Sequence, residues 1–280
     1  MKNDVVELYC NKTEDSSVDW SLVAKNQHCT LLGKKCLKNR KSEPEKTIGS
    51  CVVRHSDKEV LICPHRLIEN KAIFKDCFHL LTKHEPGNEY HLVSEIGTQA
   101  GNVDYMLASV KRGKVVDFVG IELQTMDTTG TVYPYRERFL SSVGVPGGNP
   151  SDLKSDKPFG INWKMTAKTI LVQLHHKVGL FEAFNKTLVL VLQDHLFDYM
   201  KSNFSFSHLE QASVGDAMHF HSYSYGNSAA SSSIQLKERL STDADGVGVC
   251  LGLNVTMSTD LQSLLSKIQS KISEDTLVTI

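Results

Sequence analysis

The chain has 280 residues, of which 40% are hydrophobic and 22% are charged. This composition is typical of a globular protein with one large domain or two small ones, and it excludes a disordered or collagen-like chain. The 31 Lys and Arg residues nearly balance the 32 Asp and Glu residues, giving a net charge of −1. An anionic partner would therefore have to be held by a local basic patch.

The sequence has no stretch typical of a targeting or membrane segment. The first ten residues, MKNDVVELYC, are too polar for a secretory signal. No apolar run approaches the roughly 20 residues that span a bilayer. We therefore expect a soluble, intracellular protein with no membrane partner.

Residues 1–78 are rich in cysteine and in basic residues. The chain has seven cysteines, and four of them fall in the stretch from Cys29 to Cys63. Without an export signal, this crowding favours metal binding over disulfide bonds. Four soft thiolates can close a tetrahedral structural site for zinc or iron. The predicted ligands are Cys29, Cys36, Cys51 and Cys63.

The spacing of these cysteines leaves alternatives open. It is C-x6-C-x14-C-x11-C instead of the usual paired C-x2-C, and Cys77 or His28 could replace one ligand. The thiols could also be ordinary buried side chains. A metal would stiffen the neighbouring basic segment and present it to phosphate; without one, the segment is a solvated surface. Its cations are Lys34, Lys35, Lys38, Arg40 and Lys41.

The next part of the chain predicts three strands and a long loop. A short alternating run, His91–Ile96, precedes strands at Asn102–Val110 and Val115–Gln124. Lys111-Arg112-Gly113 separates the last two strands and is a turn signal. The stretch Gly144–Gly160 is rich in Gly and Pro, so we expect a loop there.

The remaining sequence predicts helices mixed with strands. From Ala167 to Phe181, apolar residues recur at the 3–4 spacing of a helix. We then expect a buried strand, a helix, two further strands and an amphipathic closing helix, at Thr187–Leu192, His195–Asn203, His219–Tyr225, Val247–Leu253 and Leu261–Ile272. Strands with helices packed around them predict an α/β or α+β fold.

Strand periodicity sorts the side chains of Val115–Gln124 into two faces. Every second residue from Val119 to Leu123 is apolar, and this face belongs to the core. The other face carries Glu122 and Gln124 beside Gly120, which leaves room for a ligand.

The turn decides whether Asp104, on the preceding strand, shares the polar face. A three-residue loop at Lys111–Gly113, with Gly113 left-handed, would set Asp104 opposite Gly120 and diagonal to Glu122. A two-residue turn would send Asp104 to the other face.

Two carboxylates at such a hairpin suit Mg²⁺, which takes one or two carboxylates and fills its shell with water and phosphate oxygens. The chemistry would be phosphodiester hydrolysis, in which the ion activates water and stabilises the pentacoordinate phosphate. Glu95 could supply a third acid or act through another ligand. Alternatively, Asp104 and Glu122 are half-exposed strand residues without a catalytic role.

Four stretches of the chain resemble one enzyme family. They are HCTLLGKKCLKNRKSEPEKTIGSCVV (His28–Val53), ICPHRLIENKAIF (Ile62–Phe74), GNVDYMLASVKRGKVVDFVGIELQTMDTTGTVYP (Gly101–Pro134) and FGINWKMTAKTILVQLHHK (Phe159–Lys177). They are similar to the NotI family of type II restriction endonucleases, within the PD-(D/E)XK nuclease superfamily. The resemblance covers roughly residues 28–200 and is carried by the pairing of the cysteines with VDY…GIELQ.

The resemblance implies a cytoplasmic prokaryotic homodimer that cuts both strands of a GC-rich palindrome with Mg²⁺. It implies a nuclease core with a mixed central sheet flanked by helices over residues 79–280. Residues 1–78 would form a DNA-contacting element with four cysteines around iron or zinc. A restriction enzyme would normally need a DNA methyltransferase that protects the same site.

The resemblance also assigns roles to residues on the hairpin. Asp104 matches the superfamily's Asp, and Glu122 matches its Asp/Glu. Gln124 stands where most of the superfamily has Lys, although the NotI family itself carries Gln there, and Val103 stands in place of Pro. Because an amide cannot take a proton, water activation would fall mainly to the metal, with Gln124 orienting the water. Glu95 completes the candidate catalytic set.

Less specific features remain. Bidentate Arg or Lys contacts to guanine would read a GC-rich site. The candidates, which otherwise are solvated surface charges, are Arg136, Arg138, Lys154, Lys157 and the Lys34–Lys41 segment. We interpret HFHSYSYG (His219–Gly226) and the pair His175-His176 as structural. Two further functions stay open. One is a nuclease of the same fold directed to damaged or structured DNA, and the other is an inactive DNA-binding module with a four-cysteine metal site.

Overall fold

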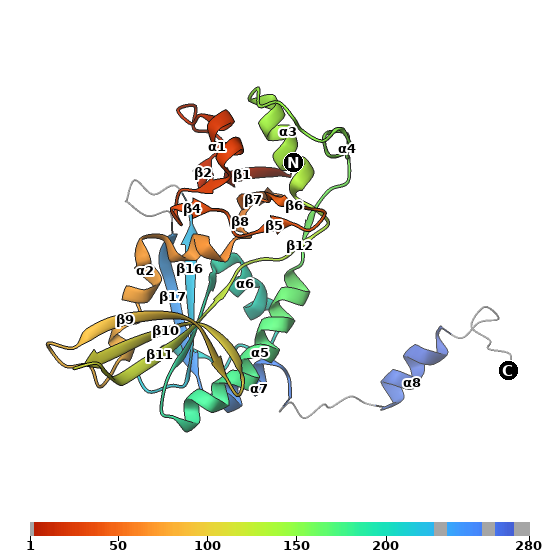
Figure 1. Ribbon diagram of the computed structural model, residues 1–280. Helices are drawn as coiled ribbons and strands as arrows, with labels where there is room; N and C mark the ends of the chain where they lie inside the picture. Colours follow the sequence, from red (N-terminus) through yellow and green to blue (C-terminus); the bar gives the residue numbers. More distant parts are fainter. Residues whose placement is uncertain (1–2, 227–233, 254–260, 272–280) are drawn as a thin grey trace.

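The computed structural model describes residues 3–226, 234–253 and 261–271 of the chain. Within these ranges, no helix combines the length and the apolar character that crossing a membrane would require. The fold is a mixed seven-stranded sheet with helices on both faces, joined at one end to a smaller sheet (Figure 1). This architecture confirms the predicted α/β (α+β) class with a mixed central sheet flanked by helices.

The central sheet has the strand order β15-β17-β16-β14-β11-β10-β9. Its strands are β9 (Glu89–Thr98), β10 (Gly101–Lys111), β11 (Lys114–Gln124), β14 (Leu188–Gln193), β15 (Glu210–Gln211), β16 (Met218–Tyr225) and β17 (Ile234–Thr242). β14 runs parallel to both β11 and β16, and the outer pairs are antiparallel. Every residue of β14 is buried, because a parallel central strand is covered on both faces.

One face of this sheet packs against three helices that come after β11 in the chain. These are α5 (Trp163–Ala183), α6 (Asp194–Asn203) and α7 (Ala244–Cys250). They share a core with Leu188, Leu190 and Leu192 of β14. The alternate residues Val189 and Val191 face the second core on the other side, as the period of a strand requires.

The opposite face is covered by the segment that leads into β9. It comprises η1 (Pro64–Lys71), α2 (Ala72–Lys75) and η2 (Phe78–Leu80). Leu67, Ile73 and Phe74 from this segment pack with Val119 and Ile121 of β11. The predicted core face of Val115–Gln124 is therefore correct.

The N-terminal part forms a four-stranded sheet of order β2-β1-β7-β8 with two small hairpins. Its elements are β1 (Asp4–Leu8), β2 (Asn11–Lys12), α1 (Trp20–Asn26), β3 (His28–Cys29), β4 (Lys34–Lys35), β5 (Asn39–Arg40), β6 (Glu43–Thr47), β7 (Ser50–His55) and β8 (Lys58–Leu61). The side-chain amide of Gln193 joins the two sheets: it accepts from Leu61 N at 2.9 Å and donates to the Glu59 carbonyl at 2.7 Å.

The long loop after the hairpin contains short elements and returns to the N-terminal sheet. They are β12 (Thr128–Thr129), α3 (Tyr133–Ser142), α4 (Pro150–Leu153) and β13 (Gly160–Ile161). In α3, Phe139 meets Trp20 of α1 edge to face, with ring centroids 4.8 Å apart. The predicted loop at Gly144–Gly160 is confirmed apart from the single turn of α4.

One predicted element is wrong and one is shorter than expected. The strand expected at Val247–Leu253 is helix α7, because Asp243 caps it by accepting a hydrogen bond from Gly246 N at 2.8 Å. Its alternating valines imitate a strand in sequence. The closing helix is α8 (Leu261–Gln269), and Ile272 lies outside the described residues.

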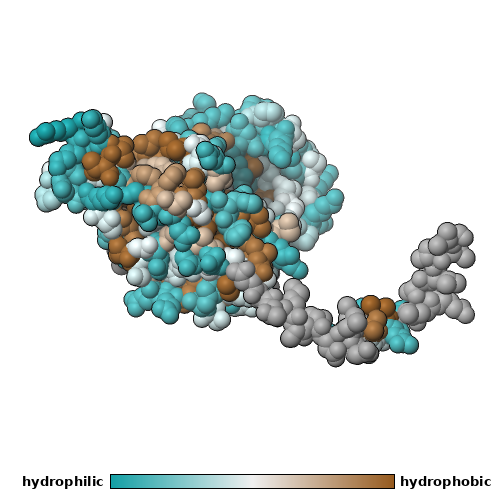
Figure 2. Space-filling model, turned by 90° about the horizontal axis from the view of Figure 1, so that it is seen from below, coloured by the Kyte–Doolittle hydropathy of each residue, from teal (hydrophilic) through white to brown (hydrophobic). Residues whose placement is uncertain are grey.

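The hairpin of β10 and β11, with β9 beside it, projects from the body of the molecule (Figure 1). β9 is the edge strand of the sheet and is exposed along most of its length. Hydrophobic side chains lie among hydrophilic ones at this projecting end (Figure 2). Tyr90, Leu92 and Val93 are among the exposed apolar residues of β9.

The buried imidazole of His221 predicts a pH-dependent stability. His221 is fully buried in β16, and burial, followed by the neighbouring His219, lowers its pKa to about 2. It therefore stays neutral in the fold but takes a proton in the unfolded chain below about pH 6.5. Its contribution to stability is complete above that pH and is lost on acidification, by about 1.4 kcal/mol per pH unit.

We expect His221→Leu to lose stability more slowly than the parent as the pH falls from 6.5 to 5. The measurement is urea unfolding at several pH values in that range. The two free energies of unfolding should approach each other by about 2 kcal/mol over this interval. Parallel curves would contradict the prediction.

Candidate active site

The hairpin that carries the candidate acids has a two-residue turn. Lys111 pairs with Lys114, and the turn residues Arg112 and Gly113 both have positive φ, 51° and 75°. Two consecutive left-handed residues are typical of the type I′ turn, whose twist matches that of the strands. Of the two turns that the sequence left open, the structure has the two-residue turn and not the three-residue loop at Lys111–Gly113.

A β-bulge next to the turn changes the register. Val110 pairs with Val115, but the neighbouring Ser109 pairs with Asp117, so Val116 is an additional residue in β11. A one-residue shift moves every following side chain of a strand to the other face relative to its partner. A two-residue turn alone would send Asp104 to the face away from Glu122, and the bulge brings it back to the same face.

The corrected register brings the two acids face to face. The ladder continues to the pair of Tyr105 and Ile121, so the next residues, Asp104 and Glu122, lie opposite each other. The three-residue loop would have set Asp104 opposite Gly120, two residues away along the strand but on the same face. The carboxylate of Asp104 also accepts a hydrogen bond from the backbone N–H of Leu123 at 2.8 Å.

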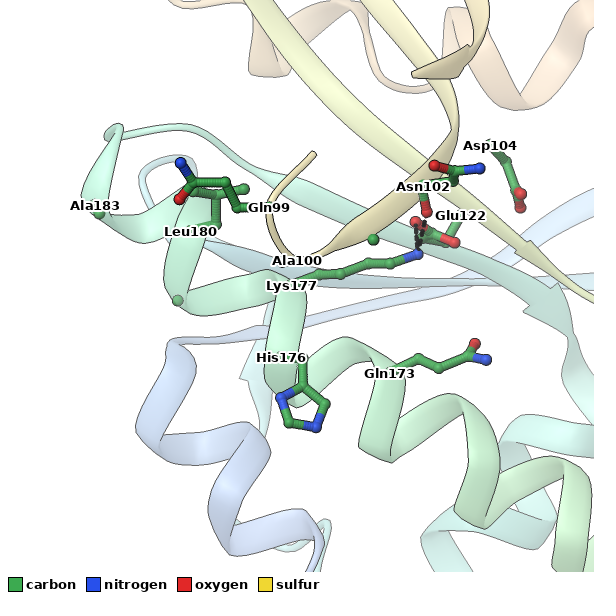
Figure 3. A pocket seen from close by; sticks show the side chains of 12 residues that line it. Gln99, Ala100, Asn102, Asp104, Glu122, Gln173, His176, Lys177, Leu180 and Ala183 are labelled. Carbon is green, nitrogen blue, oxygen red and sulfur yellow. Dashed lines mark hydrogen bonds and ion pairs between the residues drawn. The ribbon is translucent and has the colours of Figure 1, made fainter. Parts of the chain in front are cut away.

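Both acids line a cavity of about 860 Å³ between the hairpin and helix α5. The turn between β9 and β10 forms its rim, and one side of α5 forms the opposite wall (Figure 3). The wall from α5 includes Gln173, His176 and Lys177. The cavity is large enough for a sugar–phosphate unit to reach both carboxylates.

The space beside Gly120 is occupied by protein. A Cβ at this position would lie 2.4 Å from Cζ of Phe181 and 3.0 Å from Cδ1 of Leu188. The expectation that Gly120 leaves room for a ligand is therefore wrong. Its missing side chain instead lets Phe181, and with it helix α5, pack directly on the strand.

Lys177 is a residue of this site that sequence reasoning missed. Its Nζ lies 2.6 Å from Oε1 of Glu122 and also donates to the backbone carbonyl of Asn102 (Figure 3). The signal in the sequence was a lysine on the apolar side of a helix, three residues after Leu174 and four before Phe181. We had interpreted that side only by its hydrophobic spacing.

The environment of Glu122 favours its protonated form. Burial is the main cause that raises its pKa to about 7, and the negative charges of Asp104 and Glu95 act in the same direction. The hydrogen bond and positive charge of Lys177 oppose this shift. Ionised carboxylates that lie close together and away from water repel each other and lack solvation. A cation bound in the cavity would offset this electrostatic cost.

Gln124 and Glu95 lie next to the cavity but outside its lining. Gln124 is half-buried, and its Nε2 donates to the backbone carbonyl of Thr125 at 2.5 Å. Glu95 is exposed on β9 at a left-handed φ of 55°, and its charge acts on both Glu122 and Tyr105. The structure thus brings Asp104 and Glu122 together and leaves Gln124 and Glu95 at the margin.

The cysteines meet in the N-terminal part with one partner that the spacing did not indicate. The sulfur of Cys10 lies 3.7 Å from that of Cys29 and 3.6 Å from that of Cys51, and Cys51 also bonds to Cys63. Cys36 lines a cavity of about 340 Å³ together with Cys29, Cys51 and Cys63. In the described part of the chain, no group of three or more His, Cys, Asp or Glu side chains stands in metal-binding geometry.

The other proposed replacements lie elsewhere. Cys77 is buried in the second core, with its sulfur 3.9 Å from Nδ1 of His221. His28 is exposed on β3. Neither belongs to the group formed around Cys10, which is the second residue after β1 and has a left-handed φ of 64°.

The basic segment Lys34–Lys41 is exposed except at Cys36 and Arg40, which are half-buried. Arg40 pairs with Asp152 at 2.6 Å and lies over the ring of Tyr133, so it ties the segment to α3 and α4. Lys34, Lys38 and Lys41 are exposed, as is Lys35, whose Nζ donates to the backbone carbonyl of Glu45.

The structure separates the candidates for base recognition. Arg136 is buried, and it donates to the hydroxyl of Tyr9 at 2.9 Å, so its role here is structural. Arg138 donates to the carbonyl of Ser155 at 2.7 Å while its guanidinium lies over the ring of Tyr135.

Comparison with known protein families places the chain in one of them. A family model described as restriction endonuclease NotI matches residues 10–224, about three quarters of the chain. This range begins at Cys10 and includes the hairpin, helix α5 and strand β16. The chain matches no curated protein.

The contact of Gly120 with Phe181 predicts a specific loss of stability. We expect Gly120→Ala to lower the free energy of unfolding by about 1–3 kcal/mol, because the new methyl group cannot fit against the ring. Phe181→Leu in the same chain should recover part of this loss in a double-mutant cycle. The measurement is chemical denaturation.

Gly179→Ala is the matched control on helix α5, since nothing lies within 4 Å of its added Cβ. It should raise stability by up to about 1 kcal/mol, as Ala is the better helix former. Equal effects at Gly120 and Gly179 would show that the close contact is not limiting.

Proposed function

Since the chain belongs to the NotI restriction endonuclease family, we propose that it is a type II enzyme making Mg²⁺-dependent double-strand cuts at a GC-rich palindromic site. Its family makes it a site-specific nuclease that acts on double-stranded DNA. The observation that best supports the finer proposal is that Asp104 and Glu122, which follow the last pair of the ladder, both line one cavity. This is the acidic pair expected of a PD-(D/E)XK nuclease.

The donor set of the cavity fits Mg²⁺. Asp104 and Glu122 offer carboxylate oxygens, which this hard ion prefers, and the open cavity leaves space for water and phosphate oxygens. Burial, with the negative charges of Asp104 and Glu95 acting in the same direction, raises the pKa of Glu122, and a bound cation would favour its ionised form again. Bound there, Mg²⁺ would supply activation of water and stabilisation of the charge that builds on phosphorus.

The protein's own groups would position the reactants. Asp104 is held by the backbone N–H of Leu123, so its carboxylate is fixed before any ion binds. Gln124 lies on the same face of β11 as Glu122 and can orient water through its amide, although it cannot take a proton. Glu95 would act from the edge of the site through its charge.

We further propose that the cysteines around Cys10 hold a structural iron or zinc ion. Four thiolates at about 2.3 Å from such an ion lie about 3.8 Å apart, close to the 3.6 and 3.7 Å that separate Cys10 from Cys51 and Cys29. Cys63 and Cys36 are the candidates for the fourth ligand. The ion would stiffen the exposed lysines of Lys34–Lys41 for contact with DNA phosphates.

The remaining parts of the proposal follow from the substrate. A palindrome is matched by a protein with twofold symmetry, so the working form would be a homodimer with one cavity for each strand. A companion methyltransferase would protect the same site in the host.

The first test is digestion of unmethylated, GC-rich plasmid and phage DNA with Mg²⁺. Asp104→Asn and Glu122→Gln should each lower the rate of cleavage roughly 1,000-fold, because the metal ion would no longer stabilise the transition state by several kcal/mol. Glu89→Gln, an exposed acid on the same sheet, is the control and should cut normally. Discrete fragments from the parent would establish site-specific cleavage.

Other results of this digest would favour the alternatives. A smear that depends on Glu122 would favour a nuclease directed to damaged or structured DNA. Retarded but uncut DNA would favour an inactive binding module. If Gln124→Ala cut as fast as the parent in a single turnover while Glu122→Gln was inactive, Gln124 would be removed from the site.

A second test is metal analysis of the purified protein. We expect about one iron or zinc ion per chain, lost in Cys10→Ser and Cys51→Ser together with a lower melting temperature. Cys250→Ser, a buried cysteine outside the group, is the control and should keep its metal. Comparison of Cys36→Ser with Cys63→Ser would identify the fourth ligand. A parent protein that contains no iron or zinc would refute the proposed metal site.

A further inference from the structure

A cation from helix α5 occupies the cavity beside the acidic pair. The ammonium of Lys177 contacts Glu122 on β11 and the carbonyl of Asn102 on β10, two residues before Asp104 (Figure 3). It is therefore held between the two strands that carry the acids. Its side chain is only 10% exposed and extends across the cavity wall.

The fold fixes this ammonium from two directions. Phe181, one helical turn further along α5, fills the space over Gly120 and sets the rotation and height of the helix. The carbonyl of Asn102 then determines where the chain of Lys177 ends. A side chain restrained at both ends has lost its rotamer freedom before substrate arrives, which favours a role in chemistry.

The chemistry of the sheet lacks such a group. Gln124 is neutral, so the strands offer acids and an amide but no positive charge for the scissile phosphate. An ammonium has three donors, and in the described part of the chain Glu122 and Asn102 accept two of them. The third donor remains for a phosphate oxygen.

We propose that Lys177 is the active-site cation of this enzyme and donates to the scissile phosphate during hydrolysis, the task that Gln124 cannot perform. This inference rests on the proposed nuclease function. A donor placed where negative charge builds stabilises the transition state more than the ground state. Lys177 would retain its bond to Asn102 when a metal ion takes up the carboxylate of Glu122.

A second buried lysine shows what a purely structural pair looks like in this chain. Lys186 forms an ion pair with Asp117 at the other end of β11. It is about as buried as Lys177, but it lies outside the cavity lining. Lys186→Met is therefore the matched control for Lys177→Met.

The test is single-turnover cleavage of unmethylated GC-rich plasmid DNA at saturating Mg²⁺. We expect Lys177→Met to cut roughly 10²–10³-fold more slowly, the usual effect of removing one donor to a developing charge. Lys186→Met should lower the melting temperature but leave the rate of the folded enzyme unchanged. Lys177→Gln, which retains a hydrogen-bond donor without the charge, serves if the Met variant does not fold.

Rescue distinguishes a catalytic cation from a structural one. In the double variant Lys177→Met/Gln124→Lys, a lysine returns on the same face of β11 as Glu122, and we expect at least a tenfold recovery of the rate. A salt bridge that only stabilised the fold would not be restored from this position. Absence of recovery, with both variants folded, would overturn the proposal.

DNA binding provides a readout apart from cleavage. The binding assay uses Ca²⁺ in place of Mg²⁺ and an uncut plasmid fragment as probe. Lys177→Met should reduce the slope of log Kd against log salt concentration by about 0.9 for each phosphate contact that is lost. Unchanged slope and near-parental cleavage in Lys177→Met would overturn the inference while Glu122→Gln still confirmed a nuclease. A parent that cuts no DNA would overturn both proposals.

Discussion

The close approach of Phe181 to Gly120 is the contact on which the rest of the site depends. Because this position in β11 has no side chain, the ring rests on the strand itself and fixes the height and rotation of α5. One turn earlier, Lys177 consequently lies above Glu122, and the same helix closes the cavity in front of Asp104. Dense packing transmits such a constraint because neighbouring groups cannot relax independently.

Helices and strands in which apolar residues recur at a regular spacing were predictable from the sequence. The register of the β10–β11 hairpin was not. Alternation identified the core face of β11 and placed Glu122 and Gln124 on the other face. Nothing in the two adjacent valines, Val115 and Val116, indicates that one of them is an additional residue. The sequence left the length of the turn open and gave no sign of the bulge. The two-residue turn that is present would alone have sent Asp104 to the other face, and the bulge returns it to the face of Glu122.

Single residues within regular patterns were the second limit of the sequence. Lys177 stands among apolar residues at helical spacing, so the pattern predicts the helix and hides the exception. Cys10 lies far from the four crowded cysteines and joins them only because β1 and β7 are neighbours in the small sheet. The strand expected at Val247–Leu253 failed for a local reason, the cap that Asp243 provides.

Buried polar groups join the N-terminal sheet to the central sheet and to the segment that covers it. Glu7 of β1 accepts from Arg66 at 2.7 Å and from the hydroxyl of Tyr225 at 2.6 Å, at the end of β16. Loss of one partner would leave a buried charge uncompensated, which is far more costly than the pair itself. A displacement of the N-terminal sheet would therefore also displace the end of β16 in the central sheet.

Because of the bulge at Val116, the number of residues between Asp104 and Glu122 decides whether the two carboxylates lie on the same face of the sheet. Between Asp104 and Glu122, gain or loss of one residue transfers one carboxylate to the far side of the sheet, whereas a change of two leaves both on the same side. The tip of the hairpin is thus free to vary in length, but only in even steps or by exchanging a turn residue for a bulge. In related enzymes that keep both carboxylates at the site, we expect insertions and deletions in the hairpin to involve an even number of residues, or to be compensated by a bulge.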